Sequence, residues 1–492
     1  MKRVPLSQVR IESPFSVAQI LDVNLIAKAN EHATLKLVAL LHDDDSTQGL
    51  KKDLSGQGIT LRDSDGNVLF SGPIQTANID VTNELYKLYV TCRSYSFLLD
   101  IKENYRSFQA LSDTYQSVLE FVHEQSVIVV NKRHYIAAPE FQYQETDWKF
   151  TLRLASHFCT VVIPGHIQNE PYVCFGVPTG KTYTISEDAY EVGFDDYGYQ
   201  YRKSEHPEIA SVDFMYRKVR SMYNYQLGDK IENGGATFTI FEKYMTVVDG
   251  YLDCRYTIGS EHGFGIRNYD NVAINGAILF GTVLEREYDK VKVHFDFDPH
   301  QDKETAFWFP YLPDTANTFY STPIVGTRVG VKVQTGTPVA IHCERTNGQQ
   351  HALLSDYNQR YFTTEFSKRL AMETDTMFFT GGSNRLEAND GQGIKGITQK
   401  SVVVSASGDI SINGNSVNII TPEMIKASKM HTETNITMAG NEINIYSIDT
   451  QIHSDGTDEM PYPTRDIVPA MTMSSDIAVT ALGAQAAVSK VS

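Results

Sequence analysis

The sequence predicts a mainly β protein, and three observations lead to that fold class. The 492-residue chain is rich in Tyr (27) and Phe (24), which are residues that favour strands. Short segments alternate apolar and polar side chains with the period of two that marks a half-buried strand. Asp65-Gly66 lies between two alternating arms in residues 58–74, and that dipeptide is a strong hairpin signal. A chain of this length can hold roughly three or four domains.

The composition describes a soluble globular protein, with 41% hydrophobic and 21% charged residues. The net charge of −17 argues against a surface for phosphates, because nucleic-acid affinity comes largely from Lys and Arg. No sequence-specific nucleic-acid partner is therefore expected. An acidic surface that repels DNA or cargo and an ordinary solvated acidic surface both fit this charge.

The five cysteines are scattered and contain no C-x-x-C pair, so they indicate neither a disulfide framework nor a zinc site. We expect each to pack as a small apolar residue. The N-terminal stretch "MKRVPLSQVRIESPF" lacks the apolar core of a signal peptide, and no apolar run reaches membrane-spanning length. The sequence therefore predicts a protein made in the cytoplasm that leaves the cell by lysis or through a machine.

The elements follow one another in a clear order. Residues 33–41 place Ala33, Leu35, Leu37 and Ala39 on one face of a strand. After the 58–74 hairpin, residues 85–100 alternate again. Further strands are expected in 181–194 and 235–258, and a compact β segment runs from about 270 to 345.

One segment, residues 112–125, changes to helical spacing. Its apolar residues Tyr115, Val118, Leu119 and Val122 recur at the helical period. Ser112 and Thr114 are both suitable N-caps. The segment predicts a short amphipathic helix within the β-rich chain.

Two stretches imitate ligand-binding loops. "GVPTGKT" (176–182) resembles a phosphate loop, but only three residues separate its glycines and an alternating strand follows, where the loop needs four residues and a helix. "DSDGN" (63–67) opens like a calcium loop, but Ile74 stands where the bidentate Glu should be, and a hairpin turn explains the same residues.

A third stretch, "HFDFDPHQD" (294–302), gathers two His and three Asp. A metal site and a solvated strand end both remain open for it. No G-x-S-x-G, H-E-x-x-H or Cys–His arrangement is present. The sequence therefore predicts no catalytic residue, no cofactor and no resident metal, and offers no positive case for an enzyme.

The tail, residues 405–454, alternates apolar and small polar residues. Its segment 410–419 matches 436–445 at an offset of 26, with Gly and Asn aligned at the turn. The apolar residues that alternate in these segments are Ile410, Ile412, Val417, Ile419, Ile436, Met438, Ile443 and Ile445.

A single extended strand that buries one face against nothing cannot offset the entropy lost on ordering it. The apolar strip must therefore line a core shared between coils of one chain or between several chains. A solenoid should repeat many times at a steady period, and this match occurs once. Interwound strands from several identical chains fit the tail better, and such a prism has no open sheet edge.

Three regions resemble the hub–spike proteins of contractile injection machines, that is, VgrG of type VI secretion and the fused hub and spike proteins of phage tails and phage-tail-like bacteriocins. The first region carries Phe70, Gly72 and Ile74, then Ser96, Leu99 and Asp100, then Arg106 to Gln109. The second is the strand pair around 225–252. The third is similar to an oligonucleotide/oligosaccharide-binding (OB) barrel, with signature residues Trp308, Pro323, Gly326, Val329, Val331, Gly336 and Pro338.

This resemblance implies two hub β-barrels with small helices, an OB-fold barrel and an intertwined triple-stranded β-helix spike. The expected domains are a first hub barrel with its helix (1–125), a second hub barrel (126–270), the OB-fold (271–345), a connector (346–375), a trimeric spike (376–460) and a C-terminal tail (461–492). The tail would dock a separate tip protein or remain disordered.

The resemblance also implies a mechanical role as the hub and puncturing spike at the centre of a baseplate. A homotrimer would match the sixfold tail tube to a threefold spike, contact the baseplate wedge proteins and enter a target cell envelope on contraction. The protein would then be part of a virion, a bacteriocin particle or a cell-anchored secretion system.

The chain departs from the family pattern at two places. Asp289-Lys290-Val291 replaces the Gly-Arg-Val that usually precedes the central OB strand. The tip has only His453 where the family often has a His-x-His pair that binds iron, so no iron is predicted. A trimeric receptor-binding fibre and a wall-degrading spike enzyme are the alternative functions.

Overall fold

The computed structural model describes residues 4–42, 53–130, 134–185, 189–233, 235–315, 319–334, 338–344, 352–430, 434–446 and 471–473. The chain divides into two compact units, Met1–His351 and Ala352–Ser492. Antiparallel sheets dominate both units, so the mainly β prediction is confirmed.

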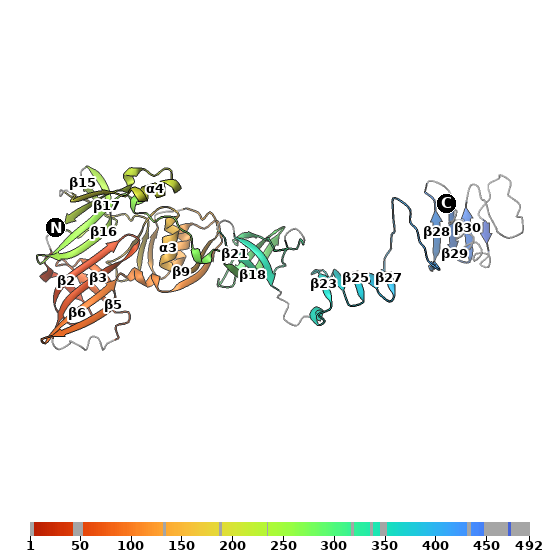
Figure 1. The fold of residues 1–492 in the computed structure, drawn as a ribbon, viewed down its shortest axis with the longest axis horizontal. Coiled ribbons are helices and arrows are strands. Elements are labelled where there is room, and N and C mark those ends of the chain that lie inside the picture. Colours follow the sequence, from red (N-terminus) through yellow and green to blue (C-terminus); the bar gives the residue numbers. More distant parts are fainter. Residues whose placement is uncertain are drawn as a thin grey trace. The chain divides into compact units, whose positions relative to one another are not determined.

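A 12-stranded sheet forms the largest part of the first unit (Figure 1). Its main path runs β1-β4-β5-β6-β3-β2-β16-β17-β14-β13, while β15 pairs with both β16 and β12. The strands are β1 (Arg10–Glu12), β2 (Val17–Lys28), β3 (Glu31–Leu41), β4 (Gly58–Arg62), β5 (Val68–Thr82), β6 (Leu85–Arg93), β12 (Thr182–Thr184), β13 (Glu191–Phe194), β14 (Met215–Ser221), β15 (Lys230–Asn233), β16 (Ala236–Val248) and β17 (Tyr251–Gly259).

The sheet consists of two halves that meet where β2 pairs with β16. We call β1–β6 the first half and β12–β17 the second half. On β3, the alternation predicted from sequence is confirmed, because Ala33, Leu35, Leu37 and Ala39 are all buried. One continuous hydrophobic core runs through both halves, so the two halves are packed as a single body.

The predicted hairpin at 58–74 is confirmed by the pairing of β4 with β5. Its turn is organised by Asp63, whose Oδ1 accepts hydrogen bonds from the backbone N–H groups of Asp65 (2.9 Å) and Asn67 (2.8 Å). The carboxylate therefore serves the turn, in agreement with the hairpin interpretation of "DSDGN".

Gly72 of this hairpin is required by close packing. A Cβ atom at this position would lie 1.9 Å from the carbonyl oxygen of Arg93. The backbones of β5 and of the end of β6 therefore approach each other at a distance that only glycine permits.

The alternating segment 85–100 is a strand only as far as Arg93. Residues Tyr95–Asp100 instead form the 3₁₀ helix η3, so the extended prediction for that part was wrong. The side chain of Ser96 turns inward and hydrogen-bonds His32 Nδ1 at 2.9 Å, and alternation cannot reveal this contact because the two residues are 64 positions apart.

Two helices pack together beside the large sheet. Helix α2 (Tyr115–Val122) buries all four predicted residues, and its N-cap is Thr114, whose side chain accepts from the N–H of Ser117. Helix α3 (Asp147–Ser156) is capped by Thr146. They share a core with the three-stranded sheet β10-β11-β8. These neighbouring strands are β8 (Val127–Val130), β10 (Val162–Pro164), β11 (Tyr172–Phe175), and the ribbon of β7 (Glu103–Phe108) with β9 (Glu140–Thr146).

Residues 278–344 form a five-stranded barrel. The strands are β18 (Ile278–Glu287), β19 (Lys290–Phe295), β20 (Trp308–Pro310), β21 (Arg328–Lys332) and β22 (Val339–Glu344), in the order β20-β19-β18-β21-β22. A parallel bridge between Tyr311 and Ala340 closes the sheet. With the strands numbered along the chain, the order is 1-2-3-5-4-1, which is the topology of an OB-fold. The predicted OB-fold barrel is confirmed.

The second unit contains two antiparallel meanders, which we call the first and second C-terminal sheets. The first comprises β23 (Arg360–Thr363), β24 (Arg369–Met372), β25 (Thr376–Gly381), β26 (Asn384–Asn389) and β27 (Gly393–Ile397). The second comprises β28 (Met424–Ser428), β29 (Asn435–Ala439), β30 (Glu442–Tyr446) and β31 (Met471–Met473). Residues 346–375, expected as a connector, thus already contain two strands of the first sheet.

No strand lies between Ile397 and Met424 in this described part of the chain. The strand expected over 405–419 is therefore not formed in the single chain, since nothing in the described part of the chain pairs with it. Segment 436–445 does form strands, as β29 and β30.

The remaining helical elements are short and lie at the borders of the sheets. They are η1 (Leu6–Gln8), α4 (Asp196–Glu205), η4 (Ser211–Phe214), α5 (Glu261–Phe264), η5 (Val272–Ile274) and η7 (Ala352–Leu354). Among the described residues, no helix has the length and apolar character needed to cross a membrane.

Candidate functional site: a buried joint and two apolar sheet faces

The ribbon β7–β9 joins the OB barrel to the rest of the first unit, and we call these contacts the joint. Phe141 of β9 belongs to the core of the OB barrel and packs edge-to-face on Phe295, with ring centroids 5.5 Å apart. Gln109 donates from Nε2 to the carbonyl oxygen of Val293 at 3.0 Å, and its Oε1 accepts from the N–H of Phe307 at 3.2 Å. Apolar and polar contacts together therefore fix the barrel to the ribbon.

Asp298 adds a second polar contact to the joint. Its carboxylate accepts from the N–H of Ser107 at 2.9 Å and from the Ser107 hydroxyl at 2.5 Å. Burial raises the pKa of Asp298, while these hydrogen bonds oppose the shift. Both oxygens of the most buried carboxylate in "HFDFDPHQD" thus serve the joint. Within the described ranges, no group of three or more potential ligand residues could hold a metal ion.

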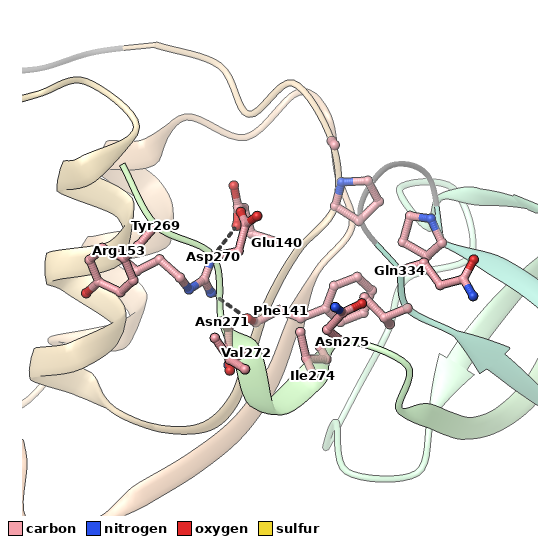
Figure 2. A pocket seen from close by; sticks show the side chains of 14 residues that line it. Glu140, Phe141, Arg153, Tyr269, Asp270, Asn271, Val272, Ile274, Asn275 and Gln334 are labelled. Carbon is pink, nitrogen blue, oxygen red and sulfur yellow. Dashed lines mark hydrogen bonds and ion pairs between the residues drawn. The ribbon is translucent and has the colours of Figure 1, made fainter. Parts of the chain in front are cut away.

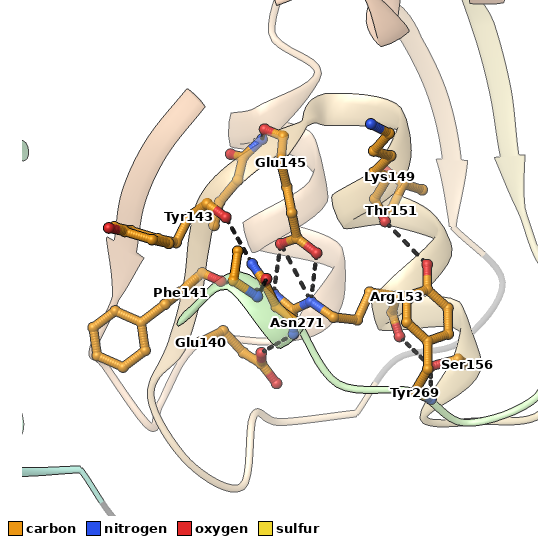
Figure 3. Close-up of polar contacts among 12 residues, drawn as sticks. Glu140, Phe141, Tyr143, Glu145, Lys149, Thr151, Arg153, Ser156, Tyr269 and Asn271 are labelled. Atoms are coloured by element: carbon orange, nitrogen blue, oxygen red, sulfur yellow. Dashed lines mark hydrogen bonds and ion pairs between the residues drawn. The ribbon is translucent and has the colours of Figure 1, made fainter. Parts of the chain in front are cut away.

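Arg153 organises the polar centre of the joint (Figure 3). It lies on α3 and its side chain is only 7% exposed. Its Nε donates to Glu145 at 2.9 Å, Nη1 to Glu140 at 3.3 Å, and Nη2 to the carbonyl oxygen of Phe141 at 2.7 Å. The guanidinium therefore holds both ends of β9 against the helix.

This ion-pair cluster is tied to the start of the OB barrel as well. Asn271 donates from Nδ2 to the carbonyl oxygen of Tyr143 at 2.7 Å (Figure 3). On the other side of the ribbon, Arg106 forms an ion pair with Asp147 at 2.6 Å and bonds Gln142 at 2.7 Å. Buried charge pairs of this kind are costly to break because the partner is left without a counter-charge.

A cavity of about 490 Å³ opens beside Arg153, between α3 and the OB barrel (Figure 2). Its apolar wall includes Phe141, Ile274 and Val333, and its polar wall includes Glu140 and Asp270. The cavity lies within the contacts of the joint, and most of its lining residues belong to the ribbon, to α3 and to the OB barrel with the segment that precedes it.

The second candidate site is one face of the first C-terminal sheet. The strand register places a set of apolar side chains on the same face, and we call this set the first apolar face. It consists of Phe362, Leu370, Met372, Met377, Phe379, Leu386, Ala388 and Ile394. Six of these side chains are exposed, with Ile394 at 80%, so the described chain leaves this face uncovered.

Charged side chains cover the aromatic rings on the opposite face of the same sheet. Arg385 lies over the ring of Phe378, 4.1 Å from its centroid, and Arg369 lies over Tyr361. Arg385 also pairs with Glu387 at 2.6 Å. One face is thus suited to water and the other is not.

The second C-terminal sheet has the same division. The register of β28, β29 and β30 places Ile425, Ala427, Ile436, Met438, Ile443 and Ile445 on one face, which we call the second apolar face. Ile443 is buried and Ala427 is exposed, while the other four side chains of this face are half-buried. Four of the predicted spike residues therefore share one face, as alternation predicted.

The other four predicted spike residues lie outside any strand. Ile410, Ile412, Val417 and Ile419 are all exposed, with Ile412 at 72%. Val402, Val403 and Val404 precede them and are equally exposed. His453, the residue considered at the tip, lies outside the described residues.

The predicted OB signature residues occupy several places in the barrel. Val329 and Val331 are fully buried on β21. Trp308 is the first residue of β20, and Nζ of Lys292 lies 4.8 Å from the centroid of its ring. Pro323 and Gly326 belong to the turn before β21, where Gly326 adopts φ +86°. Pro338 lines the joint cavity, and Gly336 lies outside the described residues.

The joint was not predicted from the sequence, and Arg153 is its most important residue. One signal for it existed, since Arg153 interrupts the apolar face formed by Phe150, Leu154 and Ala155 on α3. A charge on a buried helix face predicts a buried partner. The identity of Glu140 and Glu145 as those partners depends on the path of β9.

Fold and site describe a modular β protein. In sequence order it has a 12-stranded sheet of two halves, an OB barrel fixed to that sheet by a buried joint, and two C-terminal sheets, the first of which has an uncovered apolar face. No family model matches this chain, and no curated protein matches it either.

Solved structures do resemble it. One is the E. coli c3393 protein, a component of the type VI secretion system described as similar to the T4 tail proteins gp27 and gp5. That likeness has 14% identity and a TM-score of 0.48, and covers 68% of this chain and 98% of that chain. A chain of the Francisella PdpA–VgrG complex matches with 9% identity and a TM-score of 0.49, over 77% of this chain and 76% of that one.

A prophage MuSo2 43 kDa tail protein from Shewanella oneidensis also matches, with 9% identity and a TM-score of 0.40, over 54% of this chain and 100% of that chain. This chain is therefore similar to VgrG-like and phage tail proteins. With identities this low and TM-scores below 0.5, its function has to rest on its own residues.

Proposed function

We propose that this protein is the central hub and spike of a contractile injection machine and acts as a homotrimer. The observation that carries the proposal is the uncovered first apolar face, which is followed along the chain by the half-buried second apolar face. Exposed apolar patches of this extent mark interaction surfaces. Three copies that turn these faces toward a common axis would bury them in a shared core.

The trimer would form a prism closed by its own chains. A closed arrangement leaves no free strand edge and excludes water from the axis, so it would resist bending under compression. Residues 401–421, which form no strand in the single chain, would pair with the neighbouring copies. The eight predicted core residues, from Ile410 to Ile445, would then line the axis.

The paired halves of the large sheet support the hub role. Each chain carries two sheet halves joined at β2 and β16, so three chains would present six related surfaces to a sixfold tail tube. Baseplate wedge proteins would surround this ring, and residues 461–492 would dock a tip protein. The joint would transmit the thrust from this ring to the OB barrel.

The proposed role is structural and not enzymatic. The acidic chain, with a net charge of −17, would pass an envelope without retaining nucleic acid. It would act as part of a tail-like particle, in a virion, a bacteriocin or a secretion system.

The experiment that tests this proposal compares the solution mass of the full chain with that of residues 1–351. We expect a trimer of the 55.2 kDa chain and a monomeric or weakly associated shorter chain. The boundary at 351 separates the two compact units. A monomer in both cases would remove the physical basis of the proposal.

A further inference from the structure

Lys243 is a fully buried lysine inside the second half of the large sheet. It lies on β16, and its Nζ donates to Oδ1 of Asn224. Among the described residues, no carboxylate lies within ion-pair distance of this ammonium. Lysine is almost never fully buried unless it is paired. Asp229 is attracted to the ammonium from a longer distance, so the ammonium of Lys243 is buried without a direct ion pair and its only described hydrogen bond is to Asn224.

Asn224 is held over Lys243 by a tyrosine. Tyr256 is the direct cross-strand partner of Lys243. Its hydroxyl donates to the carbonyl oxygen of Tyr223 at 2.6 Å and accepts from the N–H of Tyr225 at 2.9 Å. Tyr256 therefore fixes Tyr223 and Tyr225, the two chain neighbours of Asn224, next to Lys243. Two reactive groups that are held in contact react as if each were present at very high concentration.

The surroundings also favour the free amine. Burial lowers the pKa of Lys243 to about 8, so about a tenth of the side chains are neutral and nucleophilic at pH 7, far more than for an ordinary lysine. Nε2 of His166 is buried without a hydrogen-bond partner in the described structure. His166 interacts electrostatically with Lys243, and burial lowers its pKa well below the usual value. The imidazole beside Lys243 is therefore neutral.

We propose that Lys243 and Asn224 become joined by an intramolecular isopeptide bond. The lone pair of Nζ attacks Cγ of Asn224 and forms the Nζ–Cγ bond. The Cγ–Nδ2 bond then breaks, and the amide nitrogen leaves as ammonia with the proton that Nζ gives up. The proton passes from Nζ to the departing nitrogen, and no oxidant, cofactor or metal is required.

The bond would tie β16 to the connection between β14 and β15, which contains Asn224. β16 also pairs with β2 of the first half, so the cross-link lies next to the seam between the halves. A covalent bond at this place would hold the connection between β14 and β15 against β16 under mechanical load. The inference concerns the chemistry of one chain and does not depend on the proposed trimer.

Mass spectrometry of the denatured full-length protein tests it. We expect an intact mass below the sequence mass by one ammonia molecule. Trypsin should yield peptide 221–230 covalently linked to 231–255, with no cleavage after Lys243. An unmodified mass and separate peptides would show that the contact is only a hydrogen bond.

Variants separate the bond from other losses of ammonia. A succinimide at Asn233-Gly234 would lose the same mass but leave the two peptides unlinked. Lys243→Met and Asn224→Ala should both abolish the mass loss, while the matched control Lys230→Met should retain it. Asn224→Asp should form the same bond with loss of water.

If Lys243→Met does not fold, Asn224→Ala gives the same result, since Asn224 is only partly buried. A fully linked population in the Asn224→Ala variant would overturn the assignment of the partner.

Discussion

The two units of this chain treat apolar side chains in opposite ways. In the first unit, the alternating residues of β3 and β21 are buried, and Val329 and Val331 have no exposed surface. In the second unit, residues with the same alternation, such as Phe379 and Ile412, remain more than half exposed. Alternation alone does not bury a face, because a second layer must be present to cover it.

The opposite faces of the C-terminal sheets sharpen this comparison. The face that carries Arg385 and Arg369 is already suited to water, whereas the first apolar face is not. A sheet with no second layer to pack against would be expected to have polar side chains on both faces. The second unit is therefore an incomplete core, and the first unit is a complete one.

The largest effect is expected from a charge on the first apolar face. Phe379→Asp should prevent the trimer from forming, with the dissociation constant rising at least about a hundredfold, since each buried carboxylate costs several kcal/mol. Because Phe379 is exposed in the single chain, the substitution should leave the monomer folded. Sedimentation at several concentrations measures the effect.

The matched control is Thr380→Asp, the next residue, which points to the opposite face of β25. It should leave the trimer intact. Equal dissociation in both variants would mean that the first apolar face is not the shared core.

Within the first unit, the largest loss of stability is expected from a substitution of Arg153 in the joint. Arg153→Met should lower the free energy of unfolding of residues 1–351 by about 3–5 kcal/mol, because Glu145 stays buried without its partner. Chemical denaturation measures it. Arg62→Met is the control, since the Arg62–Glu12 pair spans 2.7 Å but is largely exposed. It should cost no more than about 1 kcal/mol, and a similar loss in both variants would contradict the importance of the joint.

Acid should destabilise the first unit through His32. Its ring packs 4.2 Å from that of Trp148, and burial lowers its pKa to about 4. The unfolded state, with a higher pKa, binds the proton first as the pH falls. Stability is therefore full above pH 6.5 and lost between pH 6.5 and 4, by on the order of 2 kcal/mol at pH 5.

Thermal unfolding of residues 1–351 between pH 7 and 5 measures this loss. His32→Gln should reduce the pH dependence, whereas His262→Gln, at a side chain 44% exposed, should leave it unchanged. An unaltered profile for His32→Gln would assign the acid sensitivity to other groups.

The smallest effect is expected at the cap of α2. Thr114→Ala removes the acceptor for the N–H of Ser117 and should cost about 1 kcal/mol. Ser112→Ala is the control, because Ser112 was the other cap candidate and is exposed. Equal losses in the two variants would mean that the cap has no special role.

Much of the local structure could be predicted from the sequence. The hairpin around Asp65-Gly66, the face of β3 and the buried side of α2 follow from periods and turn residues that act within a few positions. The part of the second apolar face on β29 and β30 was also predictable. Alternate residues of a strand point to one face, and residues paired across two strands point to the same face.

Contacts distant in sequence could not be predicted in this way. The extended prediction failed at Tyr95–Asp100, where the contact of Ser96 with His32 and the turn of η3 replace the strand. Arg153 is visible as a misplaced charge, but nothing near it in sequence indicates that Asp298 meets Ser107 across the joint. The separation of 191 residues puts that contact beyond any local rule.

The sequence by itself determined the mainly β class, the hairpin, the helix α2 and the residues that alternate in the tail, because each depends on periodicity or on turn chemistry within one segment. The tertiary structure alone decided the pairing of β2 with β16, the closure of the OB barrel and the Arg153 joint. It also decided which apolar faces are covered and which are left open. The physical reason is that a pattern defines a face, while burial depends on what else the chain, or another copy of it, brings to that face.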